Sequence, residues 1–81
     1  MTREIFLRPT ESDSTEFTIS YWKVDPGESV RDGDELVVVE SVDEKTALAV
    51  TSPCTGVLAE VVAREGQVVG PGDLLGRIEV E

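Results

Sequence analysis

The chain has 81 residues and a formal net charge of −10, from seventeen Asp and Glu against seven Lys and Arg. This length suits one domain and is too short for two separate cores. Such acidity excludes nucleic acid and anionic membranes as partners, because binding to phosphate groups depends on clustered basic side chains. One cysteine and no histidine exclude an intramolecular disulfide, a Cys/His zinc site and an imidazole-based catalytic triad.

No stretch approaches the roughly 20 apolar residues that span a bilayer. The first six residues lack the apolar segment of a secretory signal. We therefore expect a single cytoplasmic domain over residues 1–81, with its core within about residues 15–80.

Short runs of strand-forming residues, separated by turn residues, predict an all-β chain. Strands are expected over residues 17–22, 36–42, 46–50, 57–62 and 74–80. Turns are expected at 25–28, 31–34, 65–67 and 70–73, with a polar loop at 9–15. The run from 36 to 50 predicts a hairpin whose tip carries Asp43 and Glu44.

The two halves of the sequence repeat each other at an offset of 39 residues, the separation of Gly27 and Gly66. The matched pairs are Ile19 with Leu58, Val30 with Val69, Gly33 with Gly72, Asp34 with Asp73, Leu36 with Leu75 and Val39 with Ile78. Each half reads as a strand, a glycine turn, a short strand and a long strand. Because neither half can bury its apolar face alone, the repeat predicts a flattened barrel-sandwich of two roughly four-stranded antiparallel sheets with pseudo-two-fold symmetry.

The repeat also assigns structural roles to individual residues. The four turn glycines are expected to meet backbone requirements, and Asp34 and Asp73 to stabilise turns. Trp22 takes the position of Val61 and is expected to close one end of the core. Cys54 is expected to be a small, buried or half-buried residue. No paired carboxylates, phosphate loop or nucleophile–base pair indicates an enzyme.

Four stretches in this order resemble the lipoyl and biotinyl domain family, and the resemblance extends over roughly residues 15 to 80. They are TEFTISYW at 15–22, VDPGESVRDGD at 24–34, VESVDEKT at 39–46 and SPCTGVL at 52–58. The resemblance implies a non-catalytic carrier domain whose cofactor is attached to Lys45, eight residues before Pro53. By the same resemblance, Glu40, Asp43 and Glu44 are recognition residues. Their other interpretation is an ordinary solvated turn.

The flanking sequence Asp43-Glu44-Lys45-Thr46 is closer to the lipoyl pattern than to the biotinyl pattern, in which methionines flank the lysine. Lipoate is therefore the expected cofactor and biotin the weaker alternative. The implied partners are a lipoate ligase or lipoyl transferase and the dehydrogenase and transferase components of a 2-oxoacid dehydrogenase-type system. The implied function is a swinging arm that carries acyl or related intermediates between active sites.

One departure from the family pattern concerns the hairpin, which is two residues longer between Gly33 and Lys45. If the strands keep their register, Glu40 lies opposite Ala47, and Lys45 lies one step from the tip, facing Val42. This displacement favours a second hypothesis, an unmodified structural or interaction module with the same fold. A biotin carrier domain of a carboxylase is a third.

Overall fold

The structure is a computed structural model that describes residues 1–7, 16–43 and 45–80. The regular elements within these ranges are β1 (Thr2–Phe6), β2 (Phe17–Trp22), β3 (Ser29–Val30), β4 (Glu35–Ser41), β5 (Ala47–Thr51), β6 (Gly56–Val61), β7 (Val68–Val69) and β8 (Leu74–Glu79). The polar loop expected at 9–15 lies outside the described residues, as does Glu44. The expected all-β class and the five expected strands are confirmed.

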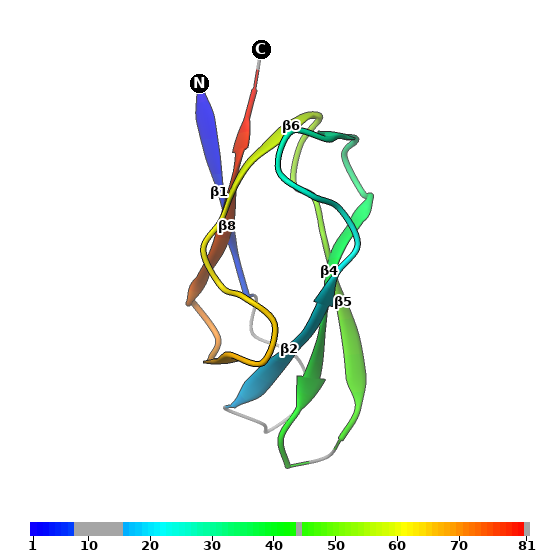
Figure 1. Cartoon of the computed structure of the whole chain (residues 1–81), viewed down its shortest axis with the longest axis vertical. Helices are drawn as coiled ribbons and strands as arrows, with labels where there is room; N and C mark the ends of the chain where they lie inside the picture. The colour runs from blue at the N-terminus through cyan, green and yellow to red at the C-terminus, as the bar shows by residue number, and fades with distance from the viewer. Residues whose placement is uncertain (8–15, 44, 81) are drawn as a thin grey trace.

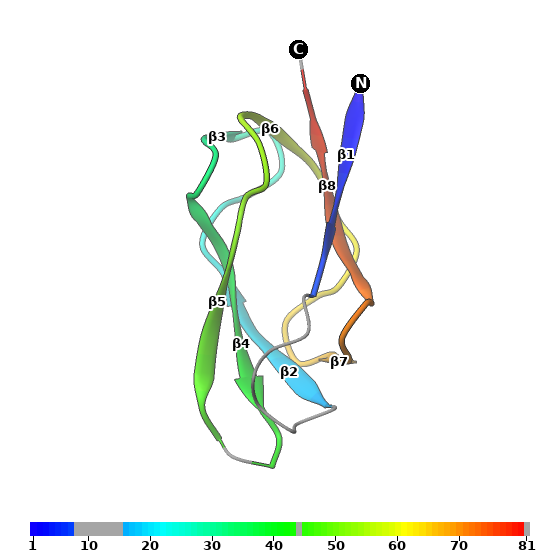
Figure 2. The ribbon, with the colours of Figure 1, turned by 180° about the vertical axis from the view of Figure 1, so that it is seen from behind.

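The eight strands form two antiparallel sheets of four strands each, which we call the first and the second sheet. The first sheet has the order β1-β8-β6-β3, and the second has the order β5-β4-β2-β7. The two layers face each other, with the β4–β5 hairpin projecting at one end and both termini at the other (Figures 1 and 2). Among the described residues there is no helix long and apolar enough to cross a membrane.

The internal repeat is present in the structure. The 39-residue offset maps β2 onto β6, β3 onto β7 and β4 onto β8, and β5 takes in the second sheet the place that β1 takes in the first. Even the irregularities repeat, since the register shift after Ile19 in β2 recurs after Leu58 in β6. The predicted pseudo-two-fold architecture is therefore confirmed strand by strand.

The turns repeat with the same chemistry. Gly27 and Gly66 have φ of 96° and 86°, a backbone conformation that glycine adopts without steric cost. One carboxylate oxygen of Asp34 accepts the Arg31 N–H at 2.9 Å. Asp73 accepts the Gly70 N–H in the same way, at 2.8 Å. The roles predicted for these residues are confirmed.

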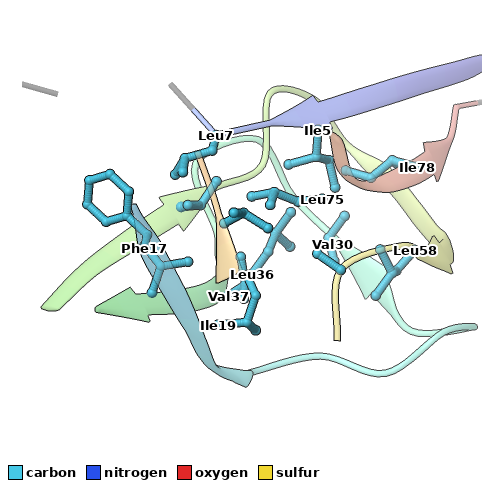
Figure 3. Close-up of a cluster of buried hydrophobic side chains, with 14 residues drawn as sticks. Ile5, Leu7, Phe17, Ile19, Val30, Leu36, Val37, Leu58, Leu75 and Ile78 are labelled. Carbon is cyan, nitrogen blue, oxygen red and sulfur yellow. The ribbon is translucent and has the colours of Figure 1, made fainter. Parts of the chain in front are cut away.

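The core lies between the sheets and is built from repeated positions (Figure 3). Eight of its buried residues are the repeat pairs Ile19 and Leu58, Val30 and Val69, Leu36 and Leu75, and Val39 and Ile78. The structure adds Ile5 and Leu7, which are 2% and 1% exposed and lie before the expected core limits. The sequence signal for β1 was weak because Ile5 alone faces inward among its five residues.

Trp22 packs against the core, which agrees with the structural role predicted for it. Its ring is half-buried, and its Nε1–H donates to the carbonyl oxygen of Ala63 at 2.7 Å. The ring edge also lies close to Gly76, where an added Cβ would come within 3.1 Å of Trp22 Cη2. Cys54 is half-buried against the core, as expected.

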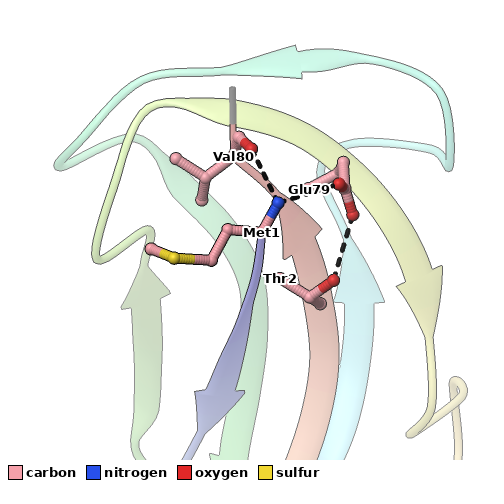
Figure 4. Close-up of polar contacts among 4 residues, drawn as sticks. All are labelled: Met1, Thr2, Glu79 and Val80. Atoms are coloured by element: carbon pink, nitrogen blue, oxygen red, sulfur yellow. Dashed lines mark hydrogen bonds and ion pairs between the residues drawn. The ribbon is translucent and has the colours of Figure 1, made fainter.

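The chain ends meet beside β1 and β8 (Figure 4). The Met1 ammonium donates to Glu79 Oε1 and to the Val80 carbonyl, both at 3.2 Å. Thr2 Oγ1 donates to the other Glu79 oxygen at 3.0 Å. These bonds lower the pKa of the Glu79 carboxyl below its ordinary value of 4.5, the ammonium having the largest effect.

Candidate functional site

The β4–β5 hairpin keeps the register expected for the lengthened loop. Glu40 pairs with Ala47, and beyond this pair the Ser41 N–H donates to the Thr46 carbonyl at 2.9 Å. The Lys45 N–H donates to the Ser41 carbonyl at 2.8 Å and closes the loop over residues 42–45. Lys45 thus occupies the last position of the loop, one step from its tip.

Lys45 is exposed and has a left-handed backbone, with φ of 55°. In the described part of the chain, every other residue with positive φ is a glycine. A non-glycine residue in this region is uncommon and costs conformational energy. The loop therefore fixes the direction in which the lysine leaves the backbone, and its amine stays open to solvent.

The opposite side of the loop is anchored to the body of the domain. The Val42 N–H donates to the Glu16 carbonyl at 3.0 Å, and Ser41 pairs with Phe17 while remaining only 2% exposed. Sequence reasoning did not single out Glu16 or Ser41. The inward position of Ser41, two residues after the buried Val39, was the available signal.

Of the predicted recognition residues, Glu40 and Asp43 are exposed and lie on the same hairpin as Lys45. Glu40 is on the exposed side of β4, immediately before the loop, and Asp43 lies within the loop. Glu44 lies outside the described residues. The structure therefore places Glu40, Asp43 and Lys45 on one hairpin, which lies at the end of the molecule opposite the chain ends (Figure 1).

The chemistry that this site offers is an accessible primary amine on a braced loop. Within the described ranges, no group of three or more His, Cys, Asp or Glu residues is arranged to hold a metal ion. An amine of this kind can form an amide with a carboxyl group that another molecule has activated. Two repeated halves that pack as two four-stranded sheets and are joined by this hairpin define a class of small β-sandwich domains.

Comparison with known proteins identifies the family. The sequence profile of the family described as "Biotin-requiring enzyme" (Biotin_lipoyl) matches residues 6–78. The chain belongs to this biotinyl/lipoyl domain family, as the resemblance in the sequence indicated.

Three further similarities agree with this assignment. One relative is the dihydrolipoyllysine-residue succinyltransferase component of the 2-oxoglutarate dehydrogenase complex of Bartonella vinsonii subsp. berkhoffii. It is 37% identical to this chain over 79 residues, which are 98% of this chain and 19% of the relative. The lipoyl domain of the Azotobacter vinelandii 2-oxoglutarate dehydrogenase complex superimposes with a TM-score of 0.70 at 29% identity, covering 94% of this chain and 96% of that one. A single-chain long-chain acyl-CoA carboxylase matches with a TM-score of 0.72 at 26% identity, covering 96% of this chain and 7% of that one. The chain thus spans about a fifth of the length of the curated relative.

Proposed function

We propose that this chain is a swinging-arm carrier domain that bears lipoate in amide linkage on Lys45. The observation that carries the proposal is the exposed Lys45 on the hairpin that joins two quasi-equivalent halves, in a chain of the biotinyl/lipoyl family. The succinyltransferase relative and the lipoyl-domain structure support lipoate as the arm.

Attachment replaces a charged ammonium with a neutral amide. The Lys45 nitrogen, once it has lost a proton, attacks the activated carboxyl carbon of lipoate, and the activating group leaves. The product is a long flexible arm whose dithiolane ring can reach several active sites. Tethering raises the local concentration of the carried group at each site without tight binding to any of them. The domain supplies the position of the arm, and the cofactor and partner enzymes supply the chemistry.

The partners proposed for this arm are a lipoate ligase or lipoyl transferase and the components of a 2-oxoacid dehydrogenase-type complex. Glu40 and Asp43, with Glu44, are proposed as recognition charges for basic partner surfaces. The net charge of −10 supports this role, because complementary potentials accelerate encounters and suppress wrong partners.

A biotin carrier domain is an alternative, favoured by the similarity to the acyl-CoA carboxylase. The residues that flank Lys45 argue against it, since Met1 is the single methionine of the chain and lies far from the hairpin in sequence. An unmodified structural or interaction module with the same fold is the other alternative, favoured by the left-handed position of Lys45 in the lengthened loop.

Intact-mass spectrometry separates these candidates. The protein is produced in cells supplied with lipoate or biotin and their ligases, alongside the Lys45→Arg and Lys23→Arg variants. Lys23 is the matched control because it is the other lysine of the chain. One added lipoyl mass in the wild type and in Lys23→Arg, but not in Lys45→Arg, supports the lipoyl carrier. A biotinyl mass supports the biotin carrier, and an unmodified wild type contradicts both carriers.

A further inference from the structure

The pseudo-symmetry allows the exposed faces of the two sheets to be compared position by position. In the first sheet, Arg77 on β8 pairs with Glu4 on β1 and with Glu60 on β6. Its guanidinium forms an ion pair with Glu60, and its Nε lies 3.9 Å from Glu4 Oε2. This row of three strands therefore presents a charged, solvent-compatible surface.

The equivalent row of the second sheet is apolar. Val38 on β4, which takes the place of Arg77, pairs with Ala49 on β5 and Tyr21 on β2. Tyr21 is 46% exposed, and Val38 and Ala49 are half-buried. Both neighbours of Val38 in sequence are fully buried, which places Val38 itself on the outer side of the sheet.

The next row, immediately before the Lys45 loop, is more apolar in the second sheet only at its two outer positions, on β5 and β7. In the second sheet it consists of Ala47, Glu40, Thr18 and Val68, in the positions that Thr2, Glu79, Val57 and Ser29 hold in the first sheet. Val68 is 53% exposed, where its equivalent in the first sheet is a serine. We call Tyr21, Val38, Ala47, Ala49 and Val68 the apolar face.

The fold does not require this apolar face. The same backbone positions in the first sheet hold two glutamates, an arginine, a threonine and a serine, and the strands pair in the same register. Cross-strand packing stabilises a sheet with either composition. Tyr21, Val38 and Ala49 adjoin across three strands, whereas Glu40 and Thr18 lie between Ala47 and Val68 in the next row. Exposed apolar residues gathered on one face of an acidic domain indicate a site of protein contact.

We propose that the apolar face is the docking surface for the ligase that attaches the arm to Lys45. This inference rests on the proposed function. The apolar face lies on the two strands that end in the Lys45 loop and on β2 and β7 beside them. The bare lysine side chain is short, so the ligase must approach the hairpin closely and cover the strands next to it.

Charge selects this occupant over a second copy of the chain. Two copies that met through this face would bring together two Glu40 carboxylates and two bodies of net charge −10. A ligase surface with an apolar centre and a basic group opposite Glu40 complements both features. The apolar area supplies affinity and Glu40 supplies orientation.

The test exchanges the rows between the two sheets. In a Lys45→Arg background, which prevents turnover, the triple variant Tyr21→Glu, Val38→Arg and Ala49→Glu transplants the charged row onto the second sheet. The matched control, Glu4→Ala, Arg77→Val and Glu60→Tyr, makes the reverse change on the first sheet. Binding of each protein to a purified ATP-dependent lipoate ligase is measured by isothermal titration calorimetry, after circular dichroism has verified folding.

We expect the transplant to weaken binding at least tenfold and the control to leave it within about twofold of the Lys45→Arg protein. If the triple variant does not fold, Val68→Ser, which installs the residue found at the equivalent position of the first sheet, is expected to weaken binding at least threefold. Unchanged affinity in the folded variants, or no binding by the Lys45→Arg protein, would overturn the docking proposal. Mass spectrometry of the wild type decides the attachment proposal separately, because a lipoylated Lys45 with no effect of the apolar face refutes only the docking.

Discussion

A single methyl group at Gly56 is expected to destabilise the domain more than one at Gly66, although Gly66 has the less usual backbone. At Gly66, φ is 86° and an added Cβ meets nothing within 4 Å, so the cost is conformational. At Gly56, an added Cβ would lie 2.4 Å from the Glu79 carbonyl oxygen and 2.8 Å from Ile78 Cγ2. The closer of these two atoms belongs to the backbone of the neighbouring strand β8, which cannot relieve the clash by a change of rotamer as a side chain can.

The magnitudes follow from these two causes. A left-handed conformation costs a non-glycine residue about 1–2 kcal/mol, part of which is offset by the lower entropy of the unfolded alanine variant. Gly66→Ala should therefore lose about 1 kcal/mol of unfolding free energy. Gly56→Ala must push β8 away from β6, and overpacking of this kind costs about 3 kcal/mol. A domain of this size has a total stability of about 4–12 kcal/mol.

Thermal unfolding followed by circular dichroism and by Trp22 fluorescence measures both variants. At about 4–8 °C for each kcal/mol, the expected decrease in melting temperature is about 12–24 °C for Gly56→Ala and about 4–8 °C for Gly66→Ala. Equal decreases, or a larger one for Gly66→Ala, would refute the reasoning, because they would show that β6 and β8 separate at little cost.

Other changes test the core, the chain ends and the loop. Trp22→Phe keeps a ring but removes the donor to the Ala63 carbonyl, and should lower the unfolding free energy in urea by about 1 kcal/mol. Because the pKa of Glu79 is lowered in the folded protein, its carboxylate contributes stability that is present above pH 4.5 and is lost as the pH falls through the lowered pKa. Glu79→Gln should therefore reduce the loss of unfolding free energy at acid pH, measured by urea unfolding at a series of pH values. Parallel pH profiles for the wild type and the variant would contradict this. Lys45→Gly should raise the unfolding free energy by about 0.5–1 kcal/mol, because glycine accepts a φ of 55° at no steric cost, whereas Lys45→Arg should leave it unchanged.

The architecture was predictable because the two halves of the sequence contain the same pattern of apolar residues and turn residues. The glycine turns at 27 and 66, and the aspartates after the second turn of each half, have the same spacing and the same physical requirements. Val30 and Val69 occupy equivalent buried positions. Each lies in a short strand and pairs with the first residue of a long strand in the same sheet. Two copies of one pattern gave a more specific prediction than either copy could.

Outside the repeat, the sequence carried less information. β1 has no partner at an offset of 39 residues, and it is held by pairing with β8 and by the chain-end bonds of Glu79, which depend on residues distant in sequence. The position of Lys45 one step from the tip followed from register. Its left-handed backbone and the Glu16–Val42 bond did not, because both depend on how the loop packs against β2.

The meeting of the chain ends has a consequence for engineering. Under the pseudo-two-fold, β8 and β1 are related as β4 and β5 are, so the open end of the molecule is the counterpart of the lysine hairpin. The Met1 ammonium and the Val80 carbonyl are 3.2 Å apart, and a linker of a few residues would therefore circularise the backbone without moving a strand. A lysine placed in that linker would give the circular chain a second lysine-bearing loop, at the end of the molecule opposite the β4–β5 hairpin. Each loop could then carry its own tethered group.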